Sequence, residues 1–159
     1  MAIKQKITPF LWFDTQAEEA ANYYISIFKN GRILDVSRYT DSGPGPAGSA
    51  MVVKFELHSQ HFIALNGGPH FKFTEAISMA VDCQSQEEVD ELWTKLSQDG
   101  APAQCGWLKD KFGLSWQIIP SRLPQLLQSP DRALASRVMT AMMKMTKIDI
   151  AELEKAAKG

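Results

Sequence analysis

The chain has 159 residues, a length typical of a single domain that buries a core without disulfides or a structural metal. Its 17 basic and 18 acidic residues nearly cancel and form no run of like charge, so we expect no nucleic-acid partner. No segment has the apolar length of a membrane span or the apolar centre of a signal peptide, so we expect no membrane and a cytoplasmic location. Residues 1–159 are therefore predicted to form one domain.

The two halves of the chain begin with the same order of elements. An apolar strand pattern ending at Asp14 leads into Thr15-Gln-Ala-Glu18, which is the pattern of a helix capping box. About seventy residues later, a second apolar pattern ending at Asp82 leads into Ser85-Gln-Glu-Glu88. A helix with one apolar stripe is predicted after each box. We expect both helices to end at a turn where glycine takes the left-handed conformation, at Asn30-Gly31 and Asp99-Gly100.

Strand patterns follow each predicted helix. They cover Arg32–Thr40, Ala50–Leu57 and His61–Asn66 in the first half, and Gln104–Leu108 and Leu114–Pro120 in the second. Asp110-Lys-Phe-Gly113 has the residues of a type I turn between the last two strands. The pattern predicts an α+β fold of two βαβββ-like modules, residues 5–70 and 71–120.

Beyond Pro120 the pattern becomes helical, and residues 121–159 are predicted to form a C-terminal helical extension. Apolar residues follow helical spacing from Leu134 to Met145, and Asp149-Ile-Ala-Glu152 resembles another capping box. The methionines of this stripe have two interpretations. They pack on the sheet of their own chain, or they form a contact between subunits, because methionine suits both environments.

Several motifs together resemble one known family. They are Pro-Phe-Leu-Trp-Phe-Asp14, Ala-Glu-Glu-Ala-Ala21, Tyr-Ile-Ser-Ile-Phe28, Ala-Leu-Asn-Gly-Gly68, Cys-Gly-Trp107, Asp110-Lys-Phe-Gly-Leu-Ser-Trp-Gln117 and Met-Thr-Lys-Ile-Asp149. With the duplicated module, they resemble the vicinal oxygen chelate superfamily of glyoxalases, bleomycin-resistance proteins and extradiol dioxygenases. The match is to its PhnB-like branch, often labelled demethylubiquinone 3-methyltransferase-like. The resemblance implies mixed sheets curled around a shared cleft and a homodimer.

The resemblance also implies where a metal would bind, because metal-using members hold a divalent ion with His, Gln or Glu from four strands. Those positions fall at Ile7 or Thr8, near Ala64, near Ala76 and at Gln117. Only Gln117 offers a good ligand, so we expect no metal and no other cofactor. The three histidines, at positions 58, 61 and 70, lie at a predicted hairpin turn or in the linker between modules, where solvent exposure is expected.

The segment from Cys105 to Gln117 holds the main candidates for a small-molecule site. Strand alternation places Gln117 and Ile119 on the cleft side if the register of the family holds, and it places Cys105 and Trp107 on one face. An indole can stack on a flat ligand, and a thiol can act as a nucleophile, so Cys105 is the candidate catalytic residue. The alternative is a small packing residue, since no histidine is placed to act as its base.

Three further residues are candidates for substrate binding. Asn66 precedes Gly67-Gly68, where its carboxamide could bind a ligand or simply end a strand. Lys109 borders the last turn, where it could pair with a charged ligand or have only a structural role. Trp12 faces either the core or the cleft.

The pattern favours a protein that binds or modifies a small organic molecule in a cleft, without the metal of the superfamily. One alternative is a methyltransferase using S-adenosylmethionine, as the family label suggests. Such enzymes bind this cofactor at a glycine-rich turn that opens a helix, and neither Gly67-Gly68 nor the two helix-ending turns has that form. A second alternative is a non-catalytic, dimeric interaction protein that uses the methionine stripe.

Overall fold

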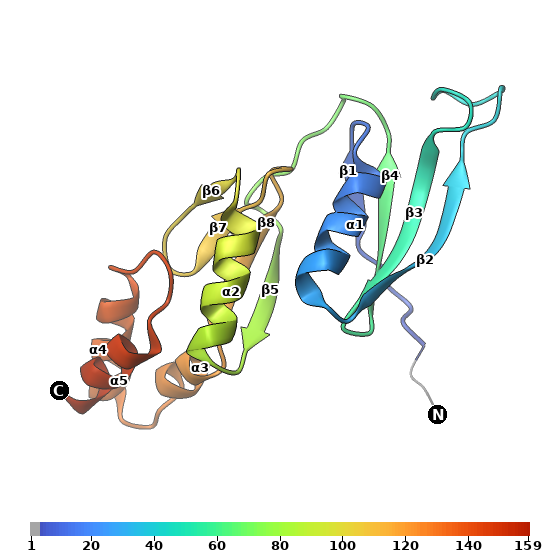
Figure 1. Cartoon of the computed structure of the whole chain (residues 1–159). Helices are drawn as coiled ribbons and strands as arrows, with labels where there is room; N and C mark the ends of the chain where they lie inside the picture. Colours follow the sequence, from blue (N-terminus) through green and yellow to red (C-terminus); the bar gives the residue numbers. More distant parts are fainter. Residues whose placement is uncertain (1–3) are drawn as a thin grey trace. The chain divides into compact units, whose positions relative to one another are not determined.

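The computed structural model describes residues 4–159, which divide into two compact units, one ending at Phe73 and one spanning Thr74–Gly159 (Figure 1). The first unit contains β1 (Phe10–Phe13), α1 (Ala17–Phe28), β2 (Gly31–Arg38), β3 (Ala50–Leu57) and β4 (Gln60–Asn66). The second contains β5 (Ser78–Cys83), α2 (Gln86–Ser97), β6 (Ala101–Pro102), β7 (Trp107–Lys109), β8 (Ser115–Pro120), α3 (Arg122–Leu127), α4 (Arg132–Met142) and α5 (Ile150–Lys158). The predicted α+β class is confirmed.

The two units share one sheet topology. Each has a four-stranded sheet, ordered β1-β4-β3-β2 in the first unit and β5-β8-β7-β6 in the second. The strand before the helix pairs in parallel with the last strand of its module, and the other neighbours are antiparallel. The predicted duplication is therefore present, with mixed sheets. The strand absent from the sequence prediction is β6, which has two residues and is too short to give an alternating pattern.

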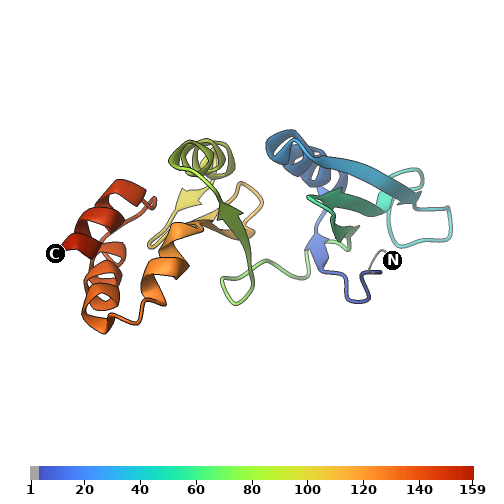
Figure 2. The same ribbon diagram turned by 90° about the horizontal axis from the view of Figure 1, so that it is seen from below.

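In each unit the helix covers one face of the sheet, as Figure 2 shows. In the first unit the sheet residues buried beneath α1 alternate along the strands, as period-two packing requires. They include Leu11, Phe13, Val53, Phe55 and Ala64. In the second unit α2 packs on β8, whose Trp116 and Ile118 are 3% and 0% exposed. Gln117 and Ile119, which lie between and beyond them, are consequently left on the opposite face, as alternation predicted.

At two of the three predicted capping boxes, the N-cap residue makes its side-chain bond. Ser85 accepts a hydrogen bond from the Glu88 backbone N–H at 3.2 Å, and Asp149 accepts one from the Glu152 N–H at 3.1 Å. The prediction for the first helix is wrong, because Gln16 occupies the N-cap and makes no side-chain capping bond. A residue distant in sequence does the capping, since Ala17 N–H donates to Asn66 Oδ1 at 2.8 Å.

The glycines after α1 and α2 have a different role from the one predicted. The left-handed residues are Lys29 and Asp99, with φ of 61° and 59°. A Cβ on Gly31 would lie 2.6 Å from a backbone oxygen of β3, and one on Gly100 would lie 2.1 Å from a backbone oxygen of β7. These glycines are required by close backbone approach, not by a left-handed φ.

Helices α3, α4 and α5, drawn in orange and red in Figure 1, form the predicted extension. They have their own apolar cluster. Its buried members are Leu123, Leu126, Val138, Ile148, Leu153 and Ala157. Met142 and Met145 pack against this cluster, whereas Met139 and Met143 are 41% and 64% exposed. Both methionines of the predicted stripe thus pack within their own chain, though on helices rather than on the sheet. A subunit contact stays a prediction.

Between residues 4 and 159, no helix combines the length and the apolar character that crossing a bilayer requires.

Candidate functional site

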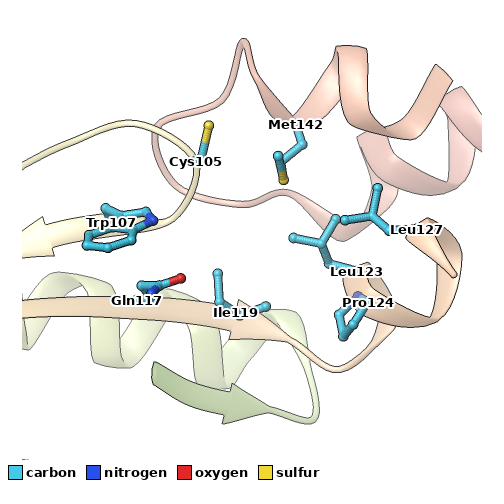
Figure 3. Close-up of a pocket in the computed structure, with 8 residues that line it drawn as sticks. All are labelled: Cys105, Trp107, Gln117, Ile119, Leu123, Pro124, Leu127 and Met142. Atoms are coloured by element: carbon cyan, nitrogen blue, oxygen red, sulfur yellow. The ribbon is translucent and has the colours of Figure 1, made fainter. Parts of the chain in front are cut away.

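The second unit contains a pocket of about 260 Å³ between the open face of its sheet and the helical extension. Figure 3 shows its lining: Cys105, Trp107, Gln117, Ile119, Leu123, Pro124, Leu127 and Met142. Three of the residues that the sequence singled out, Cys105, Trp107 and Gln117, therefore meet in one place. The other lining residues are apolar.

Cys105 reaches the pocket from a turn and not from a strand. Cys105 and Gly106 both have positive φ, 59° and 84°, so the chain turns here and β7 begins only at Trp107. The predicted strand start at Gln104 is wrong for this reason. A Cβ on Gly106 would lie 3.0 Å from atoms of Ile118, Ile119 and Ile148, so the turn is also packed tightly against β8 and the extension.

Gln117 is the polar group of the pocket. Its Nε2 donates to Ser78 Oγ on β5 at 2.8 Å, which fixes the carboxamide. Figure 3 shows its Oε1 pointing towards the other lining residues, where it can accept a hydrogen bond from a ligand. Ser115 lies two residues earlier on the same strand, and its buried Oγ has no hydrogen-bond partner among residues 4–159. Ser115 is not among the lining residues, so the polar part of the lining next to β5 is the Gln117 carboxamide.

The helical wall was not predicted. Leu123, Pro124 and Leu127 come from α3, and Met142 is the last residue of α4. The apolar residues of the segment after Pro120 predicted a helix, yet nothing in their spacing says which of them face the sheet. Only the fold of the extension against β8 puts them opposite Gln117.

Lys109 and Asp110 do not line the pocket. Lys109 forms an ion pair with Glu75, and the hydrogen bond from its ammonium lowers the pKa of that carboxyl. Asp110 is 2% exposed and serves the last hairpin, since its carboxylate accepts from Phe112 N–H, Leu114 N–H and Trp116 Nε1–H. The predicted turn is confirmed by the Gly113 N–H bond to the Asp110 carbonyl at 2.9 Å. Ligand binding by Lys109 stays a prediction.

Trp12 and Asn66 lie in the first unit. Trp12 Nε1 donates to the Gly68 carbonyl at 2.9 Å, and its ring packs edge-on against Phe71 with centroids 4.9 Å apart. Since Leu11 and Phe13 are buried under α1, Trp12 faces away from that core. The Asn66 side chain bonds Ala17 N–H and the Ala50 carbonyl, so both ends of its carboxamide already have backbone partners. Substrate binding by either residue stays a prediction.

The positions of the superfamily metal site do not fit a divalent cation. Ala64 is 1% exposed on the helix-covered face, so its two neighbours on the opposite face are Ile63 and Leu65. His61, nearer the start of β4, shares that face, and its ring is paired with Glu56. Ile63 and Leu65 offer no metal ligand, and the Gln117 carboxamide is already bonded to the Ser78 hydroxyl. Among residues 4–159 no three His, Cys, Asp or Glu side chains cluster closely enough to hold a metal ion. A metal-free site stays a prediction.

The two thiols are in different environments. Cys83 is 0% exposed at the end of β5, and burial raises its pKa to about 12, with the Glu88 and Asp82 carboxylates adding to the effect. Cys105 is partly exposed at the pocket. A neutral electrophile that is attacked by thiolates will therefore react with Cys105 far more readily than with Cys83.

Comparison with known proteins gives the family. A family model described as 3-demethylubiquinone-9 3-methyltransferase matches residues 5–119. A PhnB protein from Bacillus cereus is 40% identical, with a TM-score of 0.69, over 74% of this chain and 100% of its own. The chain belongs to this family. The predicted PhnB-like resemblance is thus confirmed.

The family members share their fold with more distant proteins. PA1353 from Pseudomonas aeruginosa is 20% identical, with a TM-score of 0.62, over 74% of this chain and 98% of its own. The fosfomycin resistance protein FosX from Listeria monocytogenes is 14% identical, with a TM-score of 0.59, over 80% of this chain and 100% of its own. These likenesses confirm the vicinal oxygen chelate fold. No protein with a curated description matches the chain.

The match to the 3-demethylubiquinone-9 3-methyltransferase family ends at Ile119, so the whole extension lies outside it. The motif at residues 145–149, which the sequence analysis attributed to the family, lies outside the match. Its membership of the family pattern therefore stays a prediction. Four of the eight pocket residues also lie beyond Ile119.

Proposed function

We propose that the chain binds a small, mainly apolar organic molecule in the pocket between β7, β8 and the extension. Trp107 offers the face of an indole ring to a flat ligand, and Gln117 offers a fixed hydrogen-bond acceptor. The observation that carries the proposal is this single oriented carboxamide in an otherwise apolar pocket. Binding sites for small molecules have this composition, in which a few polar groups set the orientation of the ligand.

Calorimetric titration with 4-methylphenol tests the proposal, because this probe has one ring and one hydroxyl donor. Trp107→Ala should weaken binding by about two- to tenfold through loss of ring stacking. Gln117→Leu should weaken it by about fivefold through loss of one hydrogen bond. Trp93→Phe, on α2 and outside the lining, is the matched control and should bind like the unmodified protein. No binding, or equal binding by a variant with both pocket changes, would overturn the proposal.

The rate at which the Cys105 thiol is labelled gives an independent measure of whether the pocket is occupied. Because Cys83 is buried and has a raised pKa, labelling by iodoacetamide near neutral pH should report on Cys105. Saturating 4-methylphenol should slow that labelling, since the thiol lines the same pocket. Unchanged labelling in the presence of bound probe would place the ligand elsewhere.

The description of the family favours a second candidate, transfer of a methyl group from S-adenosylmethionine. The mixed sheets differ from the parallel sheet that usually binds this cofactor, and Gly31 and Gly100 come before strands and not before helices. Calorimetry with S-adenosylmethionine separates the two candidates. Tight, saturable binding would favour the transferase over simple ligand binding.

A further inference from the structure

The pocket changes in character from one end to the other. In Figure 3, Trp107 and Gln117 lie at one end, and Leu123, Leu127 and Met142 lie at the other, with Ile119 between them. Gln117 is joined to Ser78, so the first end is a place for a polar group. The second end has only carbon and the thioether sulfur of Met142. A ligand that fills the pocket must have both characters.

The apolar end is built into the fold, because the extension is tied to the module by backbone hydrogen bonds. Cys105 N–H donates to the Met145 carbonyl and Gly106 N–H to the Thr146 carbonyl, each at 2.8 Å. The side chain of Gln86 on α2 also bonds both the Ile148 carbonyl, at 3.0 Å, and Ile150 N–H, at 2.8 Å. Met142 is three residues before the first of these attachments.

An ion pair adds a further link near the same place. Lys147 Nζ lies 2.8 Å from Asp90 Oδ1 on α2. Ile148, between the attachment points, is 0% exposed in the apolar cluster of the extension. The wall opposite β8 is therefore held in place before any ligand arrives, which reduces the entropy lost on binding.

We infer that the ligand is amphipathic, with a hydrogen-bonding ring system over Trp107 and Gln117 and an unbranched apolar arm running between α3 and Met142. This inference rests on the proposed function, since it assigns the ligand class of the same pocket. Methionine suits such an end, because its unbranched, polarizable side chain adapts to arms of different length. The helical extension thus acts as the part of the site that selects for the arm.

A series of 4-alkylphenols, from 4-methylphenol to 4-pentylphenol, tests the inference by calorimetry. Each added methylene that enters the apolar end should tighten binding by about fourfold, until the end is full. Met142→Trp fills the apolar end and should abolish this gain per methylene. Met143→Trp is the matched control, since Met143 is the next residue, 64% exposed and outside the lining, and it should keep the full gain.

A second variant protects the test against misfolding of Met142→Trp. Met142→Ala enlarges the apolar end, so the longest arm that still improves binding should become longer than in the unmodified protein. Circular dichroism and thermal melting establish that each variant is folded.

The possible results separate the two proposals. If 4-methylphenol binds at Trp107 and Gln117 but longer arms bind no tighter, the arm site is overturned and the proposed function stands. If longer arms bind more tightly and Met142→Trp retains that gain, the arm lies elsewhere and the inference is again overturned. If no phenol binds, both proposals fail.

Discussion

Asp110 is a buried carboxylate whose two oxygens hold the last hairpin together. Oδ1 accepts from Phe112 N–H at 2.8 Å and Leu114 N–H at 3.1 Å, and Oδ2 accepts from the Trp116 indole at 2.8 Å. Since Trp116 is on β8 next to Gln117, the carboxylate also fixes the strand that carries the polar group of the pocket. A turn residue identified by its spacing is thus a positioning residue for the site.

Asp110→Ala should lower the free energy of unfolding by about 3 kcal/mol, because it leaves buried N–H donors without an acceptor. Asp110→Asn should cost less, since its carboxamide keeps one acceptor oxygen. Urea unfolding measures both. Asp99→Asn is the control, an exposed aspartate within the turn that follows α2, and it should change the free energy by about 0.5 kcal/mol or less. Equal losses for Asp110→Asn and Asp99→Asn would contradict the role of the buried carboxylate.

Helix α1 begins at a cap supplied by a different element. The side chain of Asn66, at the end of β4, accepts from Ala17 N–H and donates to the Ala50 carbonyl at 2.9 Å. The backbone carbonyl of Asn66 accepts from the Tyr39 hydroxyl at 2.6 Å. One side chain therefore joins α1 to β4 and β3. Thr15, which the sequence pattern predicted as the cap, makes no side-chain capping bond to this helix.

Asn66→Ala should destabilise the chain by about 2 kcal/mol, through the lost cap and an unsatisfied carbonyl. Thr15→Ala should change the free energy of unfolding by about 0.5 kcal/mol or less, because Thr15 is exposed and does not cap. Thermal or urea unfolding of the two variants side by side gives the comparison. A larger loss for Thr15→Ala than for Asn66→Ala would mean that the helix starts as the sequence pattern predicted.

The elements that the sequence predicted well are those decided by local contacts. Strands β3 and β8 alternate apolar residues, and the cap at Ser85 acts on a residue three positions away. The prediction of the first helix cap was wrong because the residue that caps Ala17, Asn66, is 49 positions away in the sequence. The predicted strand start at Gln104 was wrong because Cys105 has a positive φ, in a turn that is held by backbone hydrogen bonds to Met145 and Thr146. Long-range contacts such as these leave no periodic signal in the sequence.

At the scale of the whole chain, the pocket is assembled from segments that only the fold brings together. Strand alternation, which is local, predicted that Gln117 and Ile119 share one face of their strand and that Cys105 and Trp107 share one face of the preceding strand. The sequence could not place Leu127 or Met142 beside them, because their positions depend on how three helices pack against one another and against β8. The polar half of the site was therefore predictable, and the apolar half was not.

The attachment of the extension depends on carboxylates as well as on apolar packing. The Lys147 ammonium, followed by the Gln86 amide, lowers the pKa of Asp90 below 3.8, and Arg122 lowers that of Glu154 below 4.5. A carboxyl whose pKa is lower in the folded chain than in the unfolded chain stabilises the folded state at pH values above its unfolded pKa. That stabilisation is lost as the pH falls through the lowered pKa. Acid should therefore weaken both ion pairs. One links the extension to α2, and the other links α3 to α5 within the extension.

The free energy of unfolding should accordingly fall as the pH drops below about 4.5, and the fall should be smaller in a variant carrying Asp90→Asn and Glu154→Gln. Both pairs are exposed, so the difference should be modest and should shrink in high salt. Urea unfolding across this pH range measures it. A variant with Glu87→Gln and Glu152→Gln removes two exposed carboxylates from the same helices and should follow the unmodified protein. If both variants behave alike, these two ion pairs do not contribute to the stability of the chain.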